Sequence, residues 1–220
     1  MKRKIIITSD GSTTIYLPEW NEHYHSKYGA IQEAYHVFIK NGLAYVDKKK
    51  YLSILEVGFG TGLNCLVSYL EAVKNNLTVE YTGIEAYPVT KQEIEKLNYT
   101  AILNAGQKIF DKMHSLSWEE RYQLSPSYSF LKKKQFFEDI TDKNQYDLIY
   151  FDAFGAGVQP ELWTETIFKK MFEALQSNGI LVTYSAKGSV RRAMQKVGFT
   201  VERLPGPPHK REMLRALKPL

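Results

Sequence analysis

The sequence has very little cysteine and no long apolar run, and both absences limit what the protein can be. Its 220 residues contain one cysteine, Cys65, which excludes an internal disulfide and any zinc site built on several thiolates. No stretch of about 20 apolar residues occurs, so we expect no membrane-spanning helix. The N-terminal segment from Met1 to Thr8 has basic residues, but its apolar stretch is too short for a signal peptide. We therefore expect a cytoplasmic protein.

Metal ligands are also scarce. His23 and His25 form an H-x-H pair, but no cysteine or clear carboxylate partner stands near them in the sequence. Such a pair is more often hydrogen-bonded or exposed than a metal site, and we expect no metal.

The overall composition is that of an ordinary globular protein. Hydrophobic residues make up 44% and charged residues 24% of the chain, which argues against large-scale disorder. A length of 220 residues suits one α/β domain with a small extension. We expect residues 1–45 to form an N-terminal hairpin and helix extension packed on a main domain of residues 46–220.

Positive charge is concentrated near the C-terminus. The formal net charge is +5, and the segment from Lys187 to Lys218 holds nine Lys or Arg and two Glu, a net of +7. The rest of the chain is therefore slightly negative. A basic region of this kind suits a polyanionic partner, although a solvated face that keeps the protein soluble would have the same composition.

The most informative stretch is a strand that ends in a glycine turn. Leu52 to Val57 is a short apolar run, and Gly58, Gly60 and Gly62 follow it. Apolar residues then recur at helical spacing from Leu63. The turn therefore delivers the backbone to a helix N-terminus, where free N–H groups favour an anionic ligand. The spacing differs from the G-x-G-x-x-G dinucleotide pattern.

Strand and helix patterns alternate along the chain, which predicts an α/β fold. We expect a doubly wound, mostly parallel sheet with an antiparallel C-terminal hairpin. Strands are expected at 4–8, 13–17, 52–57, 78–85, 135–140, 147–152, 179–184, 199–204 and 212–217. Helices are expected at 31–39 (stopped by Asn41-Gly42), from Pro88, across 101–113, from Pro160 to a cap at Asn178-Gly179, and at 189–197.

The glycine turn resembles motif I of the class I methyltransferases that use S-adenosylmethionine (SAM). The shared pattern is Glu56-x-Gly58-x-Gly60-x-Gly62. An acid at the end of the second strand can accept hydrogen bonds from ribose hydroxyls, and Glu85 stands there. The resemblance implies a Rossmann-like methyltransferase domain with SAM as its cofactor. It also implies that an acid past the third strand binds the adenine amino group, for which Asp139 is the candidate and Glu138 the runner-up. The implied cofactor residues are Glu56, Gly58, Phe59, Gly60, Thr61, Gly62, Asn64, Glu85, Asp139 and Asp152.

Several further motifs together resemble the MnmC methyltransferase family. They are Glu56-Val-Gly-Phe-Gly-Thr-Gly-Leu-Asn64, Phe151-Asp-Ala-Phe154 with Pro160-Glu-Leu-Trp163, Ser189-Val-Arg-Arg192, Tyr24-His-Ser26, Gly29-Ala30, and Gly198-Phe199 ahead of Lys210-Arg-Glu-Met213. The resemblance implies methylation of the 5-aminomethyl group of the wobble uridine in tRNA, giving the 5-methylaminomethyl(-2-thio) form. A separate enzyme would supply the aminomethyl precursor. The segment 106–134 matches this family least well.

The implied chemistry centres on Asp152. A primary amine attacks a methyl group only when neutral, and a carboxylate at a strand end could orient it and take its proton. The resemblance also implies contacts to the anticodon region of tRNA. The candidate residues are Tyr24 and His25 in a lip over the pocket, Phe154 or Trp163 for base stacking, and Lys187, Arg191, Arg192, Lys210 and Arg211 for phosphates. Arg211 and Glu212 could instead pair with neighbours in the closing hairpin.

Two alternative functions remain compatible with these motifs. The first keeps the fold but methylates another RNA, a protein or a small amine, or transfers an aminopropyl group. The second is a non-catalytic RNA-binding module, which would be expected to have lost part of its ligand site.

Overall fold

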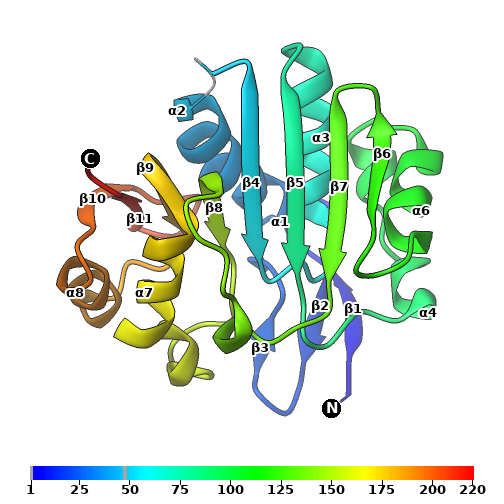
Figure 1. The fold of residues 1–220 in the computed structure, drawn as a ribbon. Coiled ribbons are helices and arrows are strands. Elements are labelled where there is room, and N and C mark those ends of the chain that lie inside the picture. Colours follow the sequence, from blue (N-terminus) through cyan, green and yellow to red (C-terminus); the bar gives the residue numbers. More distant parts are fainter. Residues whose placement is uncertain (1, 47–48) are drawn as a thin grey trace.

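An eight-stranded sheet forms the centre of the protein, whose computed structural model describes residues 2–46 and 49–220 (Figure 1). The strand order is β10-β11-β9-β8-β4-β5-β7-β6. Strands β7, β5, β4, β8 and β9 are parallel, whereas β6 and the β10–β11 hairpin pair in antiparallel fashion. The expected fold class is confirmed. The strands are β4 (Tyr51–Val57), β5 (Thr78–Ile84), β6 (Arg121–Ser125), β7 (Tyr128–Lys133), β8 (Tyr146–Phe151), β9 (Leu175–Thr183), β10 (Thr200–Pro205) and β11 (Glu212–Leu217).

Helices cover both faces of this sheet, because alternate strand residues point to opposite sides. Ile54 of β4 belongs to the core with η1, α3 and α6, whereas the next residue, Leu55, belongs to the core with α7 and α8. The helices are α1 (Ala30–Ala34), the π-helix η1 (Tyr35–Leu43), α2 (Ala44–Val46), α3 (Leu63–Lys74), α4 (Lys91–Ile94), α5 (Tyr99–Ile102), α6 (Gln107–Ser115), α7 (Glu165–Ala174) and α8 (Gly188–Lys196), with 3-10 turns η2 (Phe137–Asp139) and η3 (Pro160–Trp163).

The N-terminal segment forms a separate three-stranded sheet. β1 (Lys4–Ile7) and β2 (Thr13–Leu17) make the expected hairpin, and the two-residue strand β3 (Glu22–His23) adds to β2. The small sheet lies beyond the carboxyl ends of β4 and β5 (Figure 1). It therefore stands at the edge where ligands of open α/β sheets bind.

The helix expected to stop at Asn41-Gly42 continues to Val46. A Cβ atom on Gly42 would meet Val182 Cγ2 at 3.1 Å and Tyr150 Cε1 at 3.3 Å. Gly42 therefore allows a close approach of η1 to the sheet, and the prediction that it ends the helix was wrong.

The third strand of the parallel sheet was predicted in the wrong segment. It is β7 (Tyr128–Lys133), and the polar-aromatic segment 121–133 forms the β6–β7 hairpin at the sheet edge. The expected strand at 135–140 is instead an extended segment with the short turn η2. Part of the poorly matched segment 106–134 is thus a structural part of the sheet.

Three other predicted boundaries differ from the structure. Asn178-Gly179 does not cap a helix but lies inside β9, where the register with β8 shifts between Tyr146 and Leu148. The helix expected from Pro88 begins at Lys91, because the Thr90 side chain accepts from the Glu93 N–H in a capping box. The helical stretch expected at 101–113 is divided between α5 and α6.

Candidate functional site

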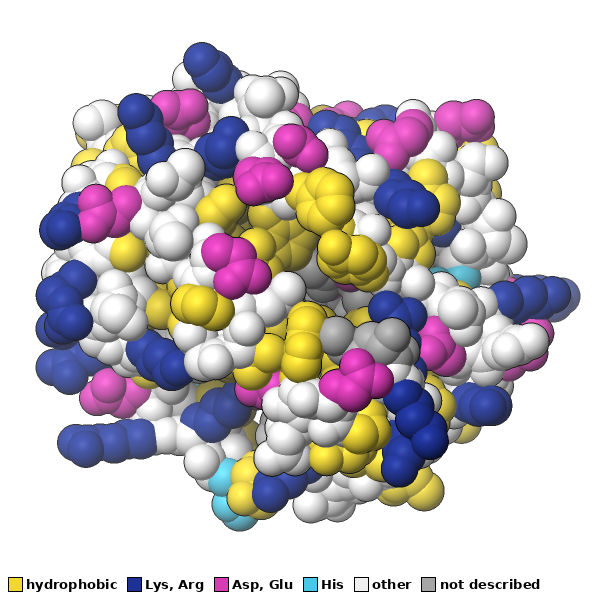
Figure 2. Space-filling view, turned by 90° about the horizontal axis from the view of Figure 1, so that it is seen from below, with side chains coloured by type: hydrophobic (Ala, Val, Ile, Leu, Met, Phe, Trp, Pro, Cys, Tyr) yellow, Lys and Arg dark blue, Asp and Glu magenta, His cyan; other side chains and the backbone are white. Residues whose placement is uncertain are grey.

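A cavity of about 1220 Å³ opens at the carboxyl ends of the parallel strands. Its walls come from the glycine loop after β4, the ends of β5 and β8, and the N-terminal segment from Leu17 to Glu33. Figure 2 looks onto this end of the molecule and shows a hollow rimmed by hydrophobic and acidic side chains. In the described residues, no helix is both long and apolar enough to cross a bilayer. Nor do the ranges 2–46 and 49–220 hold a group of three or more potential metal-ligating side chains.

The glycine loop packs tightly against the neighbouring strand. Gly58 has φ +97°, and a Cβ atom there would lie 2.5 Å from the backbone oxygen of Asp152. Only glycine tolerates both the left-handed backbone and this close approach. The ends of β4 and β8 are thereby held side by side, which brings the glycine loop and Asp152 to the same cavity.

Three side chains from outside the loop hold Thr61. His25 Nε2 lies 3.3 Å from Thr61 Oγ1, the Tyr99 hydroxyl donates to the same oxygen at 3.1 Å, and His114 Nε2 lies 3.1 Å from the Thr61 carbonyl. Burial lowers the pKa of both histidines to about 4. Both rings are therefore neutral at pH 7. We call Thr61 with His25, Tyr99 and His114 the Thr61 clamp.

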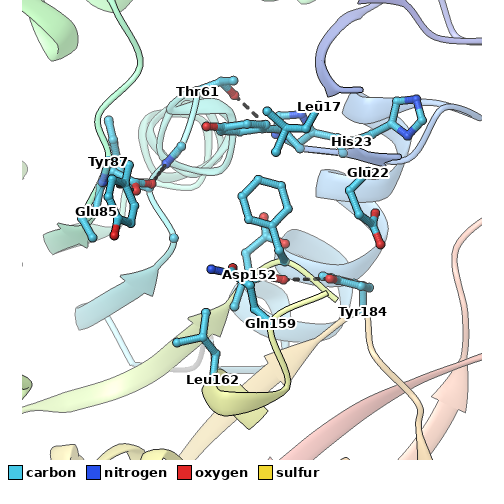
Figure 3. A pocket seen from close by; sticks show the side chains of 18 of the residues that line it. Leu17, Glu22, His23, Thr61, Glu85, Tyr87, Asp152, Gln159, Leu162 and Tyr184 are labelled. Atoms are coloured by element: carbon cyan, nitrogen blue, oxygen red, sulfur yellow. Dashed lines mark hydrogen bonds between the residues drawn. The ribbon is translucent and has the colours of Figure 1, made fainter. Parts of the chain in front are cut away.

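Glu85 lies at the end of β5 and faces the glycine loop. Its two carboxylate oxygens accept hydrogen bonds from the backbone N–H of Gly60 at 2.9 Å and of Tyr87 at 2.8 Å. Figure 3 shows Glu85 and Tyr87 together on one side of the cavity. The carboxylate expected to bind ribose hydroxyls is therefore inside the cavity and fixed in orientation.

Asp152 follows β8 and lies between the two sides of the cavity (Figure 3). One of its oxygens accepts from Asn64 Nδ2 at 2.8 Å, and the other carboxamide atom, Asn64 Oδ1, is buried without a partner. Burial and the nearby charge of Glu33 raise the pKa of Asp152 to about 7, although Asn64 and Lys210 oppose the shift. Asp152 can therefore gain or lose a proton near neutral pH.

Glu56 is fully buried under the glycine loop and does not line the cavity. One oxygen accepts from the Tyr81 hydroxyl at 2.8 Å, and the other has no partner. Burial raises the pKa of Glu56 well above its ordinary value. Glu56 therefore joins the end of β4 to β5 and does not face the cavity.

The structure separates the two candidates for the adenine contact. Glu138 lines the cavity beside Phe136 and Phe137, whereas Asp139 is exposed and lies outside the lining. Asp139 was the first candidate because a strand was expected at 135–140, with this acid at its end. The short turn η2 gives the two neighbours different directions, and it favours the runner-up.

The N-terminal segment supplies an aromatic wall. Tyr24 packs edge to face on Phe154 with ring centroids 5.0 Å apart, and Trp20 packs on the same ring at 5.7 Å. Trp163 is buried, and its indole N–H donates to the Phe154 carbonyl at 2.7 Å. Trp163 therefore cannot stack on a base, whereas the other three aromatic residues line the cavity.

The expected basic residues divide into two groups. Lys210 lines the cavity, where it forms an ion pair with Glu33. The other four do not line it; Lys187, Arg192 and Arg211 are exposed, and Arg191 is half-buried. Glu212 pairs with Arg203 at 3.6 Å in the closing hairpin. Of the ten expected cofactor residues, Gly58, Phe59, Gly60, Thr61, Asn64, Glu85 and Asp152 line the cavity, and Glu56, Gly62 and Asp139 do not.

Sequence reasoning missed several cavity residues. Glu22, Glu33 and Tyr184 surround the far side from Glu85, and Tyr87 and Phe136 form an exposed edge-to-face pair at 5.9 Å. Tyr87 could have been found, because it comes two residues after the strand-end acid. Glu33 gave no signal, since it lies among helical residues far from any motif.

Comparison with known proteins agrees with this geometry. A family model described as S-adenosyl-L-methionine-dependent methyltransferase matches residues 110–219. The chain is 27% identical over 227 residues to the tRNA 5-methylaminomethyl-2-thiouridine biosynthesis bifunctional protein MnmC of Actinobacillus pleuropneumoniae serotype 5b. That match covers 91% of this chain and 33% of the relative. The corresponding protein of Idiomarina loihiensis is 29% identical over 227 residues, covering 87% of this chain and 34% of the relative. The chain thus spans about a third of the length of these relatives.

Solved structures with similar folds agree with the sequence comparisons. The crystal structure of MNMC2 from Aquifex aeolicus superposes with a TM-score of 0.82 at 27% identity, over 99% of this chain and 70% of that one. Spermidine synthase from Thermotoga maritima, at 14% identity and a TM-score of 0.53, shares the fold over 94% of this chain and 69% of its own. The chain is an enzyme that belongs to the S-adenosyl-L-methionine-dependent methyltransferases, and it is similar in sequence and fold to the MnmC proteins.

Proposed function

We propose that this protein transfers a methyl group from SAM to the 5-aminomethyl group of the wobble uridine in tRNA, giving the 5-methylaminomethyl(-2-thio) form. The observation that carries the proposal is the place of Asp152, between the Glu85 side of the cavity and a side lined by further carboxylates. The names of the MnmC relatives support the choice of tRNA, because they describe biosynthesis of this nucleoside.

The residues of the Glu85 side suit SAM. Gly58 and Gly60 of the loop and Asn64 at the start of α3 line the cavity, so a ligand there would lie against the backbone that follows β4. Glu85 would keep its two backbone donors and accept from ribose hydroxyls with its remaining lone pairs. Glu138, which lines the cavity, would accept from the adenine amino group. When bound, SAM supplies an electrophilic methyl carbon, and the electrons of the broken C–S bond stay on sulfur.

Asp152 would orient the acceptor amine and receive its proton. An alkyl ammonium has a pKa near 10, so it must lose a proton before its nitrogen can act as a nucleophile. A carboxylate with a pKa of about 7 is ionised in part of the population at neutral pH, yet is more basic than an ordinary aspartate. Its fixed contact with Asn64 keeps the free oxygen available to the acceptor.

The rim and the basic residues would bind tRNA. Phe154 and Tyr24 offer aromatic surface for an unstacked base, which is how single-stranded bases are usually recognised. His25 is committed to the Thr61 clamp and would act indirectly, by holding the loop. Exposed Lys187, Arg192 and Arg211 remain candidates for phosphate contacts outside the cavity.

The proposed methylation depends on an earlier reaction that makes its substrate. The aminomethyl group must be made before it is methylated, so a separate enzyme activity must supply it. Because the substrate is tRNA, we expect the protein to work in the cytoplasm.

The test is methyl transfer from labelled SAM to bulk tRNA isolated from cells that lack this protein, with nucleosides identified by mass spectrometry. We expect label in 5-methylaminomethyluridine or its 2-thio form. Asp152→Asn should lower the rate by roughly 100-fold or more while SAM still binds, because general-base help is typically of this size. Label in another tRNA nucleoside would overturn the wobble-uridine assignment, and absence of label from tRNA would overturn the choice of tRNA as the substrate.

A further inference from the structure

Three carboxylates surround one aromatic ring on the side of the cavity away from Glu85. Burial, and after it the nearby charges of Asp152, Glu33 and Glu22, raise the pKa of the Tyr184 hydroxyl well above its ordinary value. All four residues line the cavity. Figure 3 shows Glu22 and Tyr184 next to each other, with Asp152 beside them. Such a concentration of negative charge favours a cationic ligand and disfavours an anionic one.

One ammonium group already occupies this side. Lys210 Nζ lies 4.2 Å from the centroid of the Tyr184 ring and forms an ion pair with Glu33 Oε1. The Glu33 side chain is only 9% exposed, whereas that of Lys210 is 33% exposed. A carboxylate and an aromatic face are the two groups that recognise ammonium ions in proteins. The position thus has the chemistry of an ammonium site, and the more exposed partner is the one that can leave.

Both recognition groups are held in place independently of Lys210. The second oxygen of Glu33 accepts from the Ser26 backbone N–H at 2.7 Å. The Tyr184 hydroxyl donates to the Ala153 carbonyl at 2.7 Å, next to Asp152 (Figure 3). Departure of Lys210 would therefore leave an oriented carboxylate and ring face beside Asp152.

We propose that Glu33 and Glu22, with the face of Tyr184, bind the acceptor amine as its ammonium ion, and that Lys210 holds this position until the acceptor displaces it. The inference rests on the proposed function, and it adds the groups that select an amine. The bound ammonium would then pass one proton to the Asp152 carboxylate, leaving a neutral amine and a carboxylic acid. An acceptor with a hydroxyl in place of the amine carries no positive charge to replace Lys210 beside Glu33, so the site would reject it.

The test measures binding of matched cationic and neutral probes to the full chain by calorimetry, with S-adenosylhomocysteine present. The pairs are 5-aminomethyluridine with 5-hydroxymethyluridine, and benzylammonium with benzyl alcohol. We expect the wild type to prefer the ammonium member of each pair by about tenfold or more, since a charged hydrogen bond is worth roughly 1.5–3 kcal/mol. Glu33→Gln, which keeps an oxygen for the Ser26 N–H, and Glu22→Gln should each reduce this ratio severalfold.

Glu161→Gln is the matched control, because Glu161 lines the same cavity and does not act on Tyr184. It should keep the wild-type ratio, and S-adenosylhomocysteine affinity should be unchanged in all variants. Lys210→Met should strengthen binding of the ammonium probes severalfold, because it removes the competing cation. This variant also keeps the test decisive where Glu33→Gln does not fold.

Equal binding of ammonium and alcohol by the wild type would overturn the inference, even with tRNA methylated. So would an unchanged ratio in both glutamine variants, or weaker ammonium binding by Lys210→Met. An ammonium preference without tRNA methylation would support the amine site and reject tRNA as the substrate.

Discussion

At the scale of single residues, burial shifts the pKa values of several ionisable groups towards their neutral forms. Asp152 has a pKa of about 7, and the two histidines of the Thr61 clamp have pKa values of about 4. These shifts affect stability in opposite directions, because the aspartate binds its proton more tightly on folding and the histidines bind theirs less tightly.

Asp152→Asn should stabilise the protein at alkaline pH. Between pH 4 and 7 the folded wild type retains a proton on Asp152 that the unfolded chain loses, so the free energy of unfolding falls as the pH rises. Asparagine carries no charge and can still accept from Asn64 Nδ2. Urea unfolding at pH 8 should show Asp152→Asn more stable than the wild type by roughly 1–2 kcal/mol. The difference should shrink towards zero at pH 4, and a constant difference across this range would contradict the role of burial.

Acid should weaken the Thr61 clamp. The unfolded chain binds protons at His25 and His114 from about pH 6.5 downwards, and the folded chain binds them only near pH 4. The free energy of unfolding should therefore fall between pH 7 and 5 by roughly 1 kcal/mol per histidine. Asp152 changes stability with the opposite sign, so the measurement is made in Asp152→Asn. In that background, His114→Gln should remove about half of the pH dependence, and retention of all of it would contradict the assignment.

At the scale of elements, glycine decides how closely neighbouring segments approach. Gly58 lets the glycine loop touch the end of β8, and Gly42 lets η1 lie against β8 and β9. A glycine turn was expected at Gly58 from the motif, but its contact with the end of β8 was not. Gly42 was misread as a helix stop, because the sequence alone does not show what lies opposite a glycine.

Gly42→Leu should destabilise the protein by roughly 1–3 kcal/mol, the usual cost of overpacking a core. The new side chain would collide with Val182 and Tyr150, which a Cβ atom alone approaches to 3.1 and 3.3 Å. Chemical unfolding measures the change. Gly106→Ala is the control, because a Cβ atom there has no neighbour within 4 Å, and it should change stability by less than about 0.5 kcal/mol. Equal effects of both substitutions would contradict the close-packing role of Gly42.

The elements that the sequence predicted best are those with a strong apolar run and a clear stop. The sequence analysis found β4, α3, β5 and β8 for this reason. It thereby also found Glu85 and Asp152, which follow the ends of β5 and β8. The third strand was missed because β7 mixes aromatic residues with Ser129 and Lys132, and the apolar residues of 135–140 gave a false strand. Because 135–140 is not a strand, the acid there that lines the cavity is Glu138 and not Asp139. The division of domains between residues 45 and 46 stays a prediction.

The acceptor side was the least predictable part. It joins Glu22 and Glu33 from the N-terminal segment to Tyr184 and Lys210 from the C-terminal part. No local pattern reports a contact between residues so far apart, and only the three-dimensional arrangement shows that they meet.

At the scale of the whole molecule, charge is divided between the cavity and its surroundings. Acidic side chains stand around the hollow in Figure 2. Lys and Arg side chains lie along the left edge of the molecule, the side of α8 in Figure 1, and others lie to the right of the hollow. This arrangement suits a substrate that carries a cationic group on a polyanionic backbone.

Reversing charges outside the cavity should weaken tRNA binding without affecting SAM. Lys187→Glu combined with Arg192→Glu should lower tRNA affinity at least tenfold, and the slope of log affinity against log salt should decrease by about 2, one for each lost phosphate contact. Filter binding at several salt concentrations measures both. Lys74→Glu, at the far end of α3, is the control and should leave the slope unchanged. An unaltered slope in the double variant would place the phosphate contacts elsewhere.

The ion pair between Glu33 and Lys210 joins residues 177 positions apart. During translation the ribosome must therefore finish almost all of this sequence before the amine site can exist. The glycine loop and Glu85 emerge much earlier, so the nascent chain passes through a stage in which the cofactor side could form without an acceptor side. Synthesis from N- to C-terminus thus completes the residues that select the substrate later than those that line the cofactor side.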